Sequence, residues 1–216
     1  NKAGEPIIYN DIMYFHDSKK KYSKKILDTE IAFNRNELYS QEKNRFTKNN
    51  IASLDIVKFI NINFLKSDSS KLTAFINIKT KKKFQMTTEL GANLNVSNGQ
   101  SIPGPYINFK VKNKKLFKGF ESLEFNTYFS IQGQASITQL DSIYSSKEFG
   151  GALTLTFPKL LIPSIIKEST LLKSQNPFKN NIFKKTKINI GYSNIKRHEY
   201  SRTNLGVSMK YEWKKG

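Results

Sequence analysis

The residue types that carry most enzyme chemistry are few in this chain, and they are not grouped. Its two histidines, His16 and His198, stand far apart, and there is no cysteine to act as a nucleophile or to form a disulfide. The sequence contains no Cys/His metal-ligand cluster, glycine-rich phosphate loop or nucleophile elbow. We therefore expect a protein that is not an enzyme and that uses no cofactor and no metal.

The nearest candidate for a catalytic pair is Glu121 with Glu124. Residues three apart on a β-strand point to opposite faces of the sheet, so these two carboxylates cannot act on one substrate. We interpret Glu121 as a residue at the rim of a sheet and Glu124 as a residue of its polar, lumenal face. His198 lies in IKRHEYSR, which we expect to be a solvated hairpin loop.

The element that must position these residues is a sheet, and residues 83–98, KFQMTTELGANLNVSN, predict its first strand most clearly. Apolar and polar residues alternate there over about thirteen positions, whereas soluble strands average about five or six and membrane-barrel strands run to about 9–11 or more. Only Thr88 breaks the apolar row, and Gly91 stands in the polar one. Five further alternating segments follow, at residues 106–111, 122–132, 149–157, 186–193 and 203–213.

Three aromatic residues stand at the ends of two predicted strands, as in the girdles of membrane barrels: Phe157, Tyr211 and Trp213. A soluble β-sandwich that buries its apolar faces would show the same alternation, and this alternative stays open. The mean hydropathy of −0.54 predicts no membrane helix but does not argue against a barrel, in which only every second residue faces lipid. Residues 1–9 contain no apolar signal-peptide segment, so an exported protein would have a native N-terminus before Asn1.

The net charge of +19 comes from 36 basic and 17 acidic residues, and a basic chain can bind nucleic acid or anionic membranes. Only four of the basic residues are arginine, the type preferred for reading bases and phosphates. We therefore expect no nucleic-acid partner. A basic soluble β protein that binds nucleic acid or polysaccharide is nevertheless a third functional alternative.

The segment before residue 83 has a different pattern and predicts a small α+β domain with helices against one face of a sheet. We expect a strand at 7–15, a helix at 19–31, a turn or short helix at 34–42, and strands at 59–65 and 72–78. Thr47 is a suitable N-cap for a second helix that would run to about residue 58. The predicted domains are therefore residues 1–82 and residues 83–216.

Four stretches of the chain resemble known protein families. NELYSQEKNRFTKNNIASLDIVKFININF resembles the closing repeat of a POTRA (polypeptide-transport-associated) domain, in which a T-x-x-x-I-x-x-L helix precedes an F-x-x-I-x-I/V-x-F strand, here Thr47, Ile51, Leu54, Phe59, Ile62 and Phe64. GPYINFKVKNKKLFKGFESLEF resembles the second strand, turn and third strand of BamA/TamA-type outer-membrane proteins. LTFPKLLIPS and the segment from residue 186 resemble the fourth to sixth strands of TamA-like proteins of Bacteroidota type.

The resemblance implies an α+β POTRA domain in the periplasm, followed by the first six antiparallel strands of a sixteen-stranded transmembrane barrel in the outer membrane. It implies that the chain is a fragment, since six strands cannot close a barrel. The implied function is assembly or translocation of outer-membrane proteins, and the alternative is a passive pore or dedicated secretion channel of the same architecture. The implied partners are outer-membrane lipid, nascent outer-membrane or secreted proteins, and a periplasm-spanning protein.

Two strand edges carry this implied function. The first barrel strand would pair weakly with the last and open as a lateral gate, with candidate residues Phe84, Met86, Thr88, Leu90, Gly91 and Leu94. Gly91 would weaken that strand, or it could simply relieve crowding on the polar face. The POTRA domain would accept an extended client segment at a sheet edge that includes Phe59, Asn61 and Asn63.

Lysines gather where the predicted topology places the periplasmic ends of the strands, and we interpret eight of them as a basic rim: Lys112, Lys114, Lys115, Lys118, Lys184, Lys185, Lys214 and Lys215. Such a rim could attract anionic lipid headgroups, with about 1 kcal/mol from each lysine. It could equally hold an acidic partner, orient the POTRA domain, or reflect the lysine-rich composition alone.

Overall fold

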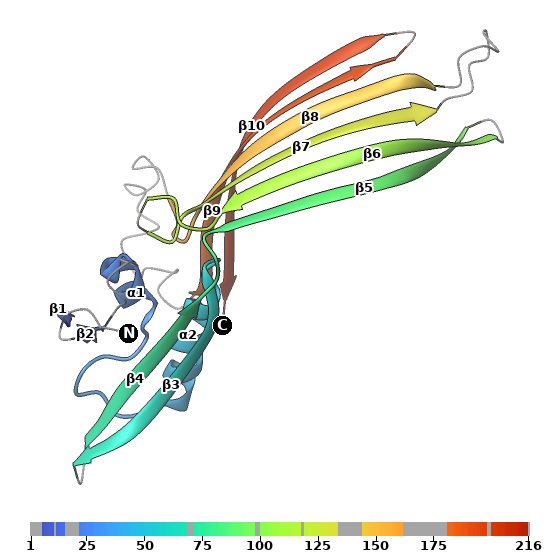
Figure 1. Ribbon diagram of the computed structural model, residues 1–216. Helices are drawn as coiled ribbons and strands as arrows, with labels where there is room; N and C mark the ends of the chain where they lie inside the picture. The colour runs from blue at the N-terminus through green and yellow to red at the C-terminus, as the bar shows by residue number, and fades with distance from the viewer. Residues whose placement is uncertain are drawn as a thin grey trace.

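The computed structural model describes residues 6–10, 12–15, 22–68, 71–97, 100–117, 119–133, 144–161, 181–197 and 200–215. Its largest element is a six-stranded antiparallel sheet in the order β10-β9-β8-β7-β6-β5 (Figure 1). The strands are β5 (Phe84–Ser97), β6 (Gln100–Asn113), β7 (Ser122–Gly133), β8 (Tyr144–Phe157), β9 (Asn181–Lys196) and β10 (Ser201–Lys215). The six predicted strands are confirmed, and five of them extend beyond their predicted bounds.

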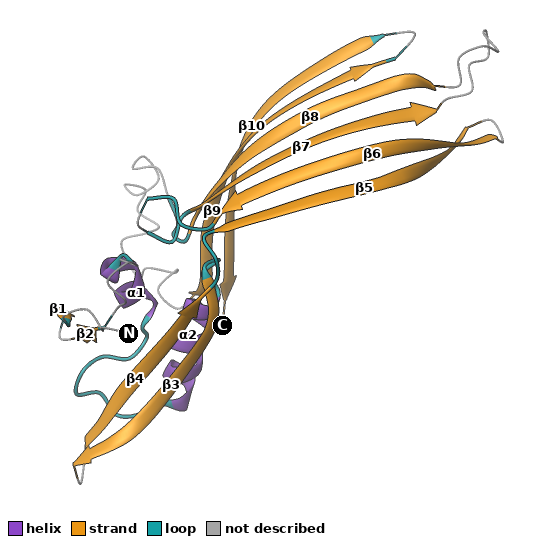
Figure 2. Ribbon diagram, viewed as in Figure 1, coloured by secondary structure: helices purple, strands orange, loops and turns teal. Residues whose placement is uncertain are grey.

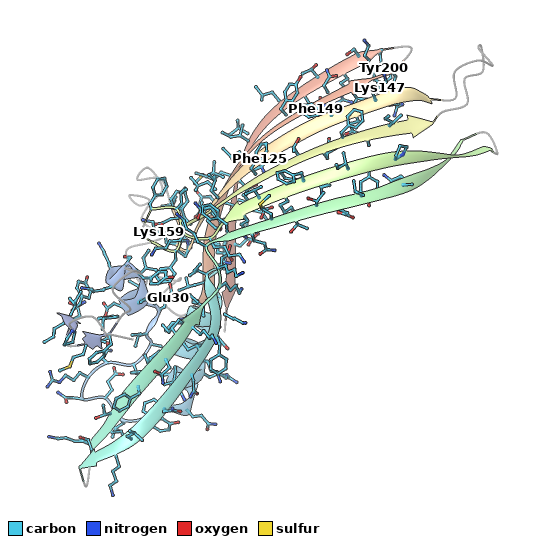
Figure 3. The ribbon with its side chains drawn as sticks, viewed as in Figure 1. Glu30, Phe125, Lys147, Phe149, Lys159 and Tyr200 are labelled. Atoms are coloured by element: carbon cyan, nitrogen blue, oxygen red, sulfur yellow. The ribbon has the colours of Figure 1, made fainter. Side chains whose placement is uncertain are left out.

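One face of this sheet is apolar across all six strands. The register joins a continuous row of cross-strand partners, Met86, Val111, Phe125, Leu153, Ile190 and Val207. Phe125 and Phe149, labelled in Figure 3, lie on this face and are 46% and 52% exposed. Because strand residues alternate between faces, the apolar positions of each strand gather on one side. No described helix or strand covers this side, but residues 159–161 hydrogen-bond to Thr186 and Tyr211 at its base.

The opposite face is polar. A second row of partners, two positions of which carry charge, consists of Gln85, Lys112, Glu124, Thr154, Asn189 and Ser208. Hydrogen bonds link side chains across this face, for example from Asn189 Nδ2 to Thr154 Oγ1 at 2.8 Å. The alternation predicted from the sequence therefore places apolar side chains on one face of the sheet and polar side chains on the other, as expected.

Two tyrosines on the polar face lie over glycines in the neighbouring strand. Tyr106 faces Gly91 and donates its hydroxyl hydrogen to Glu89 at 2.9 Å. Tyr128 faces Gly150 and donates to Glu148 at 2.7 Å. A Cβ atom at either glycine would lie only 2.6 or 2.5 Å from the tyrosine ring, so each glycine makes room for an aromatic side chain.

The N-terminal part contains all the helices that the structure describes. Its elements are β1 (Ile7–Tyr9), β2 (Ile12–Tyr14), α1 (Lys24–Glu30), α2 (Gln41–Ala52), β3 (Val57–Asp68) and β4 (Lys71–Thr80). The prediction of one strand over residues 7–15 is wrong, because Asn10 adopts a positive φ of 46° and turns the chain into the β1–β2 hairpin. β3 and β4 form a separate two-stranded sheet.

A small apolar core holds the helices against β3. Its buried residues are Ile51, Leu54, Ile56, Val57, Ile60 and Phe120, with Tyr22, Ile26, Leu27 and Ile31 packed around them. These four apolar residues all lie in the segment 19–31, which is predicted to be a helix, although α1 itself spans only Lys24–Glu30. Phe120 comes from the β6–β7 turn, so this core includes a residue of the larger sheet's connections.

The prediction of Thr47 as a helix N-cap is wrong. α2 begins at Gln41, and the cap is Ser40, whose hydroxyl accepts a hydrogen bond from the Lys43 backbone N–H at 3.3 Å. Thr47 is fully buried inside the helix, where its hydroxyl donates to the Lys43 carbonyl and accepts from the Ala32 N–H, both at 2.9 Å. Its role is to tie α2 to the segment that follows α1.

The six-stranded sheet and the β3–β4 hairpin extend in different directions from a common junction (Figures 1 and 2). β9 and β10 continue past the ends of the other strands, because residues 181–185 pair with β10 alone, and β9 contacts α2. Within the described residues, no helix has the length and apolar character required to cross a membrane.

We predict that Gly150→Ala lowers the free energy of unfolding by about 1–3 kcal/mol, because the new methyl group must displace the Tyr128 ring. Denaturant unfolding in detergent measures this loss. In a Tyr128→Ala background the same substitution should cost little, since the ring that it displaces is gone. An equal loss in both backgrounds would show that the ring contact is not the cause.

Candidate functional site at the base of the six-stranded sheet

Three side chains from the large sheet meet at Asp55, in the turn between α2 and β3. Its carboxylate accepts hydrogen bonds from Lys112 Nζ at 2.9 Å, Lys185 Nζ at 3.0 Å and Ser122 Oγ at 2.9 Å. These three partners come from β6, β9 and the start of β7. One carboxylate of the N-terminal part therefore joins three strands of the large sheet at its base.

One of the two lysines that bind Asp55, Lys112, also lies near a second carboxylate, that of Glu124. Lys112 Nζ also lies 3.7 Å from Glu124, and Lys110 Nζ lies 3.7 Å from the other oxygen of Glu124. Lys81, just after β4, donates to the Asp55 backbone carbonyl at 3.3 Å. The result is a network in which several cations surround two carboxylates.

The pKa of Asp55 reflects this surplus of cations. Burial alone would raise it, but the hydrogen bond from Lys112 and the charge and hydrogen bond of Lys185 outweigh burial and hold the pKa well below its usual range. Asp55 therefore stays ionised at all physiological pH values. The junction it forms responds to the charges around it rather than to protonation of the carboxyl group.

Aromatic packing supports the same junction. Phe120, 4% exposed, stacks on Tyr22 with ring centroids 5.5 Å apart. Lys115 Nζ lies 4.0 Å from the centroid of the Tyr22 ring, a cation–π distance. The β6–β7 turn thus contacts the residues before α1. Apolar packing and ion pairing together hold the N-terminal part against the base of the sheet.

The predicted basic rim has a mixed outcome. Lys112, Lys115 and Lys185 contact the N-terminal part, as described above, and this geometry favours the alternative in which the rim orients that part. Lys114 lies beside them in the turn after β6. Lys118 lies outside the described residues, and for Lys184, Lys214 and Lys215 only the strand positions in β9 and β10 are described. A lipid-binding role of the rim stays a prediction.

The candidate gate residues lie on β5, the terminal strand of the six-stranded sheet. Phe84, Met86 and Leu90 are exposed on the apolar face, to which Thr88 also belongs. Gly91 lies on the polar face beneath Tyr106, which favours its interpretation as a relief of crowding. Leu94 pairs with Pro103 through the backbone register, and its side chain is outside the described residues.

The candidate client edge lies on β3. Phe59 is 60% exposed, and the Asn61 side-chain amide donates to Asn63 Oδ1 at 3.1 Å on the same side of the strand. Because β3 pairs only with β4 among the described residues, each strand of this hairpin has one open edge. The structure brings the three predicted residues together but does not choose between the β3 and β4 edges.

Among the described residues, no group of three or more His, Cys, Asp or Glu side chains could hold a metal ion. Glu121 lies just before β7 and Glu124 lies on the polar face. His16 and His198 lie outside the described residues.

Sequence reasoning missed Asp55, although the sequence contains a signal for it. Asp55 is the only acidic residue between positions 43 and 67, and it stands between Leu54 and Ile56 at the end of a helix. An isolated carboxylate between two buried apolar residues needs a cationic partner. The partners could not be found in the same way, because they come from strands far along the chain.

Comparisons with known proteins add little. No protein-family model matches the sequence, and no curated protein matches it significantly. A solved structure, BamA from Haemophilus ducreyi lacking POTRA domains 1-3, is similar with a TM-score of 0.35 and 10% identity. The similarity covers 90% of this chain but 41% of that one. This TM-score is too low to establish a shared fold, so a functional conclusion must rest on the geometry of the chain itself.

We predict that Asp55→Asn lowers the free energy of unfolding at neutral pH by about 2 kcal/mol, because Lys112 and Lys185 lose the carboxylate they share. Glu42 is an exposed acidic residue in the first turn of α2. Glu42→Gln removes the same charge and should lower the free energy of unfolding by only a few tenths of a kcal/mol. Denaturant unfolding compares the two variants.

The pH dependence of this loss follows from the depressed pKa of Asp55. Its contribution is fully present above the unfolded-state pKa of about 4 and disappears as pH falls through the lower folded-state value. The difference between wild type and Asp55→Asn should therefore be constant from about pH 5 to 8 and shrink below about pH 4. A difference that already declines between pH 8 and 6 would contradict the assignment.

Proposed function

We propose that this chain is part of an outer-membrane β-barrel protein that assembles or translocates other proteins, without enzymatic activity. The observation that supports a membrane location is the exposed apolar face of the six-stranded sheet. A soluble protein rarely exposes a contiguous apolar surface of this extent. The polar face, in contrast, carries the charged and amide side chains and would line the lumen.

Strand lengths agree with this location. The six strands have 12 to 16 residues, enough to cross a bilayer at the usual tilt and to project beyond it. On the apolar face, Phe157, Thr186 and Tyr211 are cross-strand neighbours, and Trp213 follows two residues after Tyr211. The aromatic residues Phe157, Tyr211 and Trp213 would lie at the periplasmic interface, and the N-terminal part would lie in the periplasm.

The proposed mechanism uses the two open edges described above. An extended client segment would first pair with the β3–β4 hairpin, and β5, the terminal strand of the sheet, would then template the client's own strands. β3–β4 and α2 would correspond to a periplasmic POTRA-type unit. The resemblance of residues 36–64 to a POTRA repeat supports this assignment, and Asp55 would keep the unit at the base of the barrel.

We predict that Leu153→Lys blocks stable insertion of the full-length protein into the membrane, whereas Thr154→Lys is tolerated. Leu153 lies in the middle of the apolar row, and Thr154 is its neighbour on the polar face. A lysine facing the lipid midplane costs about 2–4 kcal/mol, but a lysine facing a watery lumen costs little. Heat-modifiable electrophoretic mobility after folding into liposomes measures the fraction inserted.

The same pair of variants separates the membrane assignment from a soluble one. On a water-exposed face, Leu153→Lys would leave folding unchanged or improve it, and the protein would stay in solution without detergent. That outcome would contradict the membrane location.

We predict that depletion of the protein from its native cells lowers the amounts of other outer-membrane β-barrel proteins, because their strands no longer find a template. Quantitative mass spectrometry of outer-membrane fractions measures the change, with periplasmic proteins as the internal control. Normal amounts together with single-channel conductance of the purified protein would favour the alternative, a passive pore or dedicated secretion channel.

A further inference from the structure

A cleft of about 320 Å³ lies beside Asp55 on the polar face, where β5 and β6 meet the segment after β4. It is lined by the side chains of Asp55, Lys81, Gln85, Thr87, Lys110, Lys112, Lys114 and Glu124. Four lysines thus face two carboxylates, which leaves two positive charges without an internal counterion. The proposed function does not account for this excess.

The two carboxylates are already engaged. Asp55 binds Lys112 and also Lys185, which approaches from outside the cleft, and Glu124 lies 3.7 Å from both Lys110 and Lys112. Within the part of the chain that the structure describes, no salt bridge involves Lys81 or Lys114. These two ammonium groups are therefore the source of the uncompensated charge.

The pKa of Lys114 reflects this excess of positive charge. Desolvation lowers the pKa of Lys114, and the neighbouring positive charges of Lys81 and Lys112 lower it further, against only the opposing charge of Asp55. An anion bound between these ammonium groups would relieve their mutual repulsion. The cleft is thus open and carries an excess of positive charge, which one or two negatively charged groups would balance.

We propose that this cleft binds an acidic segment of a client polypeptide, with the carboxylates of its Asp or Glu side chains between Lys81 and Lys114. The proposal rests on the proposed function, because it supposes that polypeptide clients reach the polar face of the sheet.

The composition and position of the cleft favour a peptide over a lipid phosphate. Gln85 and Thr87 of β5 add side chains that can hydrogen-bond a peptide backbone running beside the terminal strand. All the sheet residues of the cleft belong to the polar face, whereas Phe84 and Met86 face the opposite, apolar side where lipid would lie.

The test measures binding of a fluorescent hexaglutamate peptide to the full-length protein in neutral detergent by fluorescence anisotropy, with hexaglutamine as the uncharged control peptide. Wild type should bind hexaglutamate at least tenfold more tightly than hexaglutamine, and binding should weaken as salt is added. The double variant Lys81→Gln/Lys114→Gln should lose at least tenfold in affinity. Neither lysine has a salt bridge in the described structure, and the hydrogen bond from Lys81 Nζ to the Asp55 backbone carbonyl is long at 3.3 Å, so folding should be preserved.

The control variant is Lys147→Gln/Lys196→Gln, which removes two exposed lysines that are cross-strand partners at the ends of β8 and β9 opposite the cleft (Figure 3). It lowers the net charge by the same amount and should change the affinity less than twofold. Equal loss in both double variants would show that the peptide responds to net charge alone and would overturn the proposal.

Inorganic phosphate and vesicles containing phosphatidylglycerol distinguish the other anion sources. If either displaces hexaglutamate at a concentration below that of competing unlabelled peptide, the cleft is a phosphate site and the peptide assignment fails. If hexaglutamate binding depends on Lys81 and Lys114 but depletion leaves the outer-membrane proteins unchanged, the peptide site in the cleft is supported and the assembly function is contradicted. If depletion has its expected effect but wild type does not bind hexaglutamate, the peptide site in the cleft is contradicted and the assembly function is supported.

Discussion

The separation of apolar and polar side chains onto two faces of one sheet is the constraint on which the rest of the structure depends. It arises from strict alternation along six strands whose register joins like positions, such as Met86, Val111 and Phe125, into continuous rows. A one-residue slip in any pairing would move that strand's apolar residues to the polar face. The Tyr106–Gly91 and Tyr128–Gly150 pairs favour the observed register, because each aromatic ring requires a glycine directly opposite.

Local pattern was sufficient to predict the strands of the large sheet but not the shape of the N-terminal part. Alternation with period two is a local property, and long alternating segments therefore appear in the structure close to their predicted positions. Thr47 shows the limit of such reasoning, since threonine is a good N-cap in general but here bonds Ala32 from inside the helix. Similarly, residues 7–15 are rich in β-forming types, and only the positive φ of Asn10 divides them.

The junction was beyond prediction for a different reason. Asp55 meets Lys112 and Lys185, which are 57 and 130 positions further along the chain. The sequence contains many lysines near the predicted strand ends, and nothing local distinguishes the two that bind Asp55 from those that do not. Their selection follows from the register of β6 and β9, which places both ammonium groups on the polar face at the base of the sheet.

The same junction explains why the lysines near the base of the sheet do not form one uniform group. Lys112 and Lys185 both pair with Asp55, and these ion pairs stabilise the contact between the N-terminal part and the sheet. Lys81 and Lys114 stand beside this contact without such a carboxylate in the described structure, so their charge faces the cleft. If a bound anion drew Lys112 away from Asp55, the contact would weaken, because Asp55 would keep only Lys185 as an ionic partner. Occupation of the cleft and the attachment of the N-terminal part would therefore be coupled through Lys112, which lines the cleft and binds Asp55 at the same time.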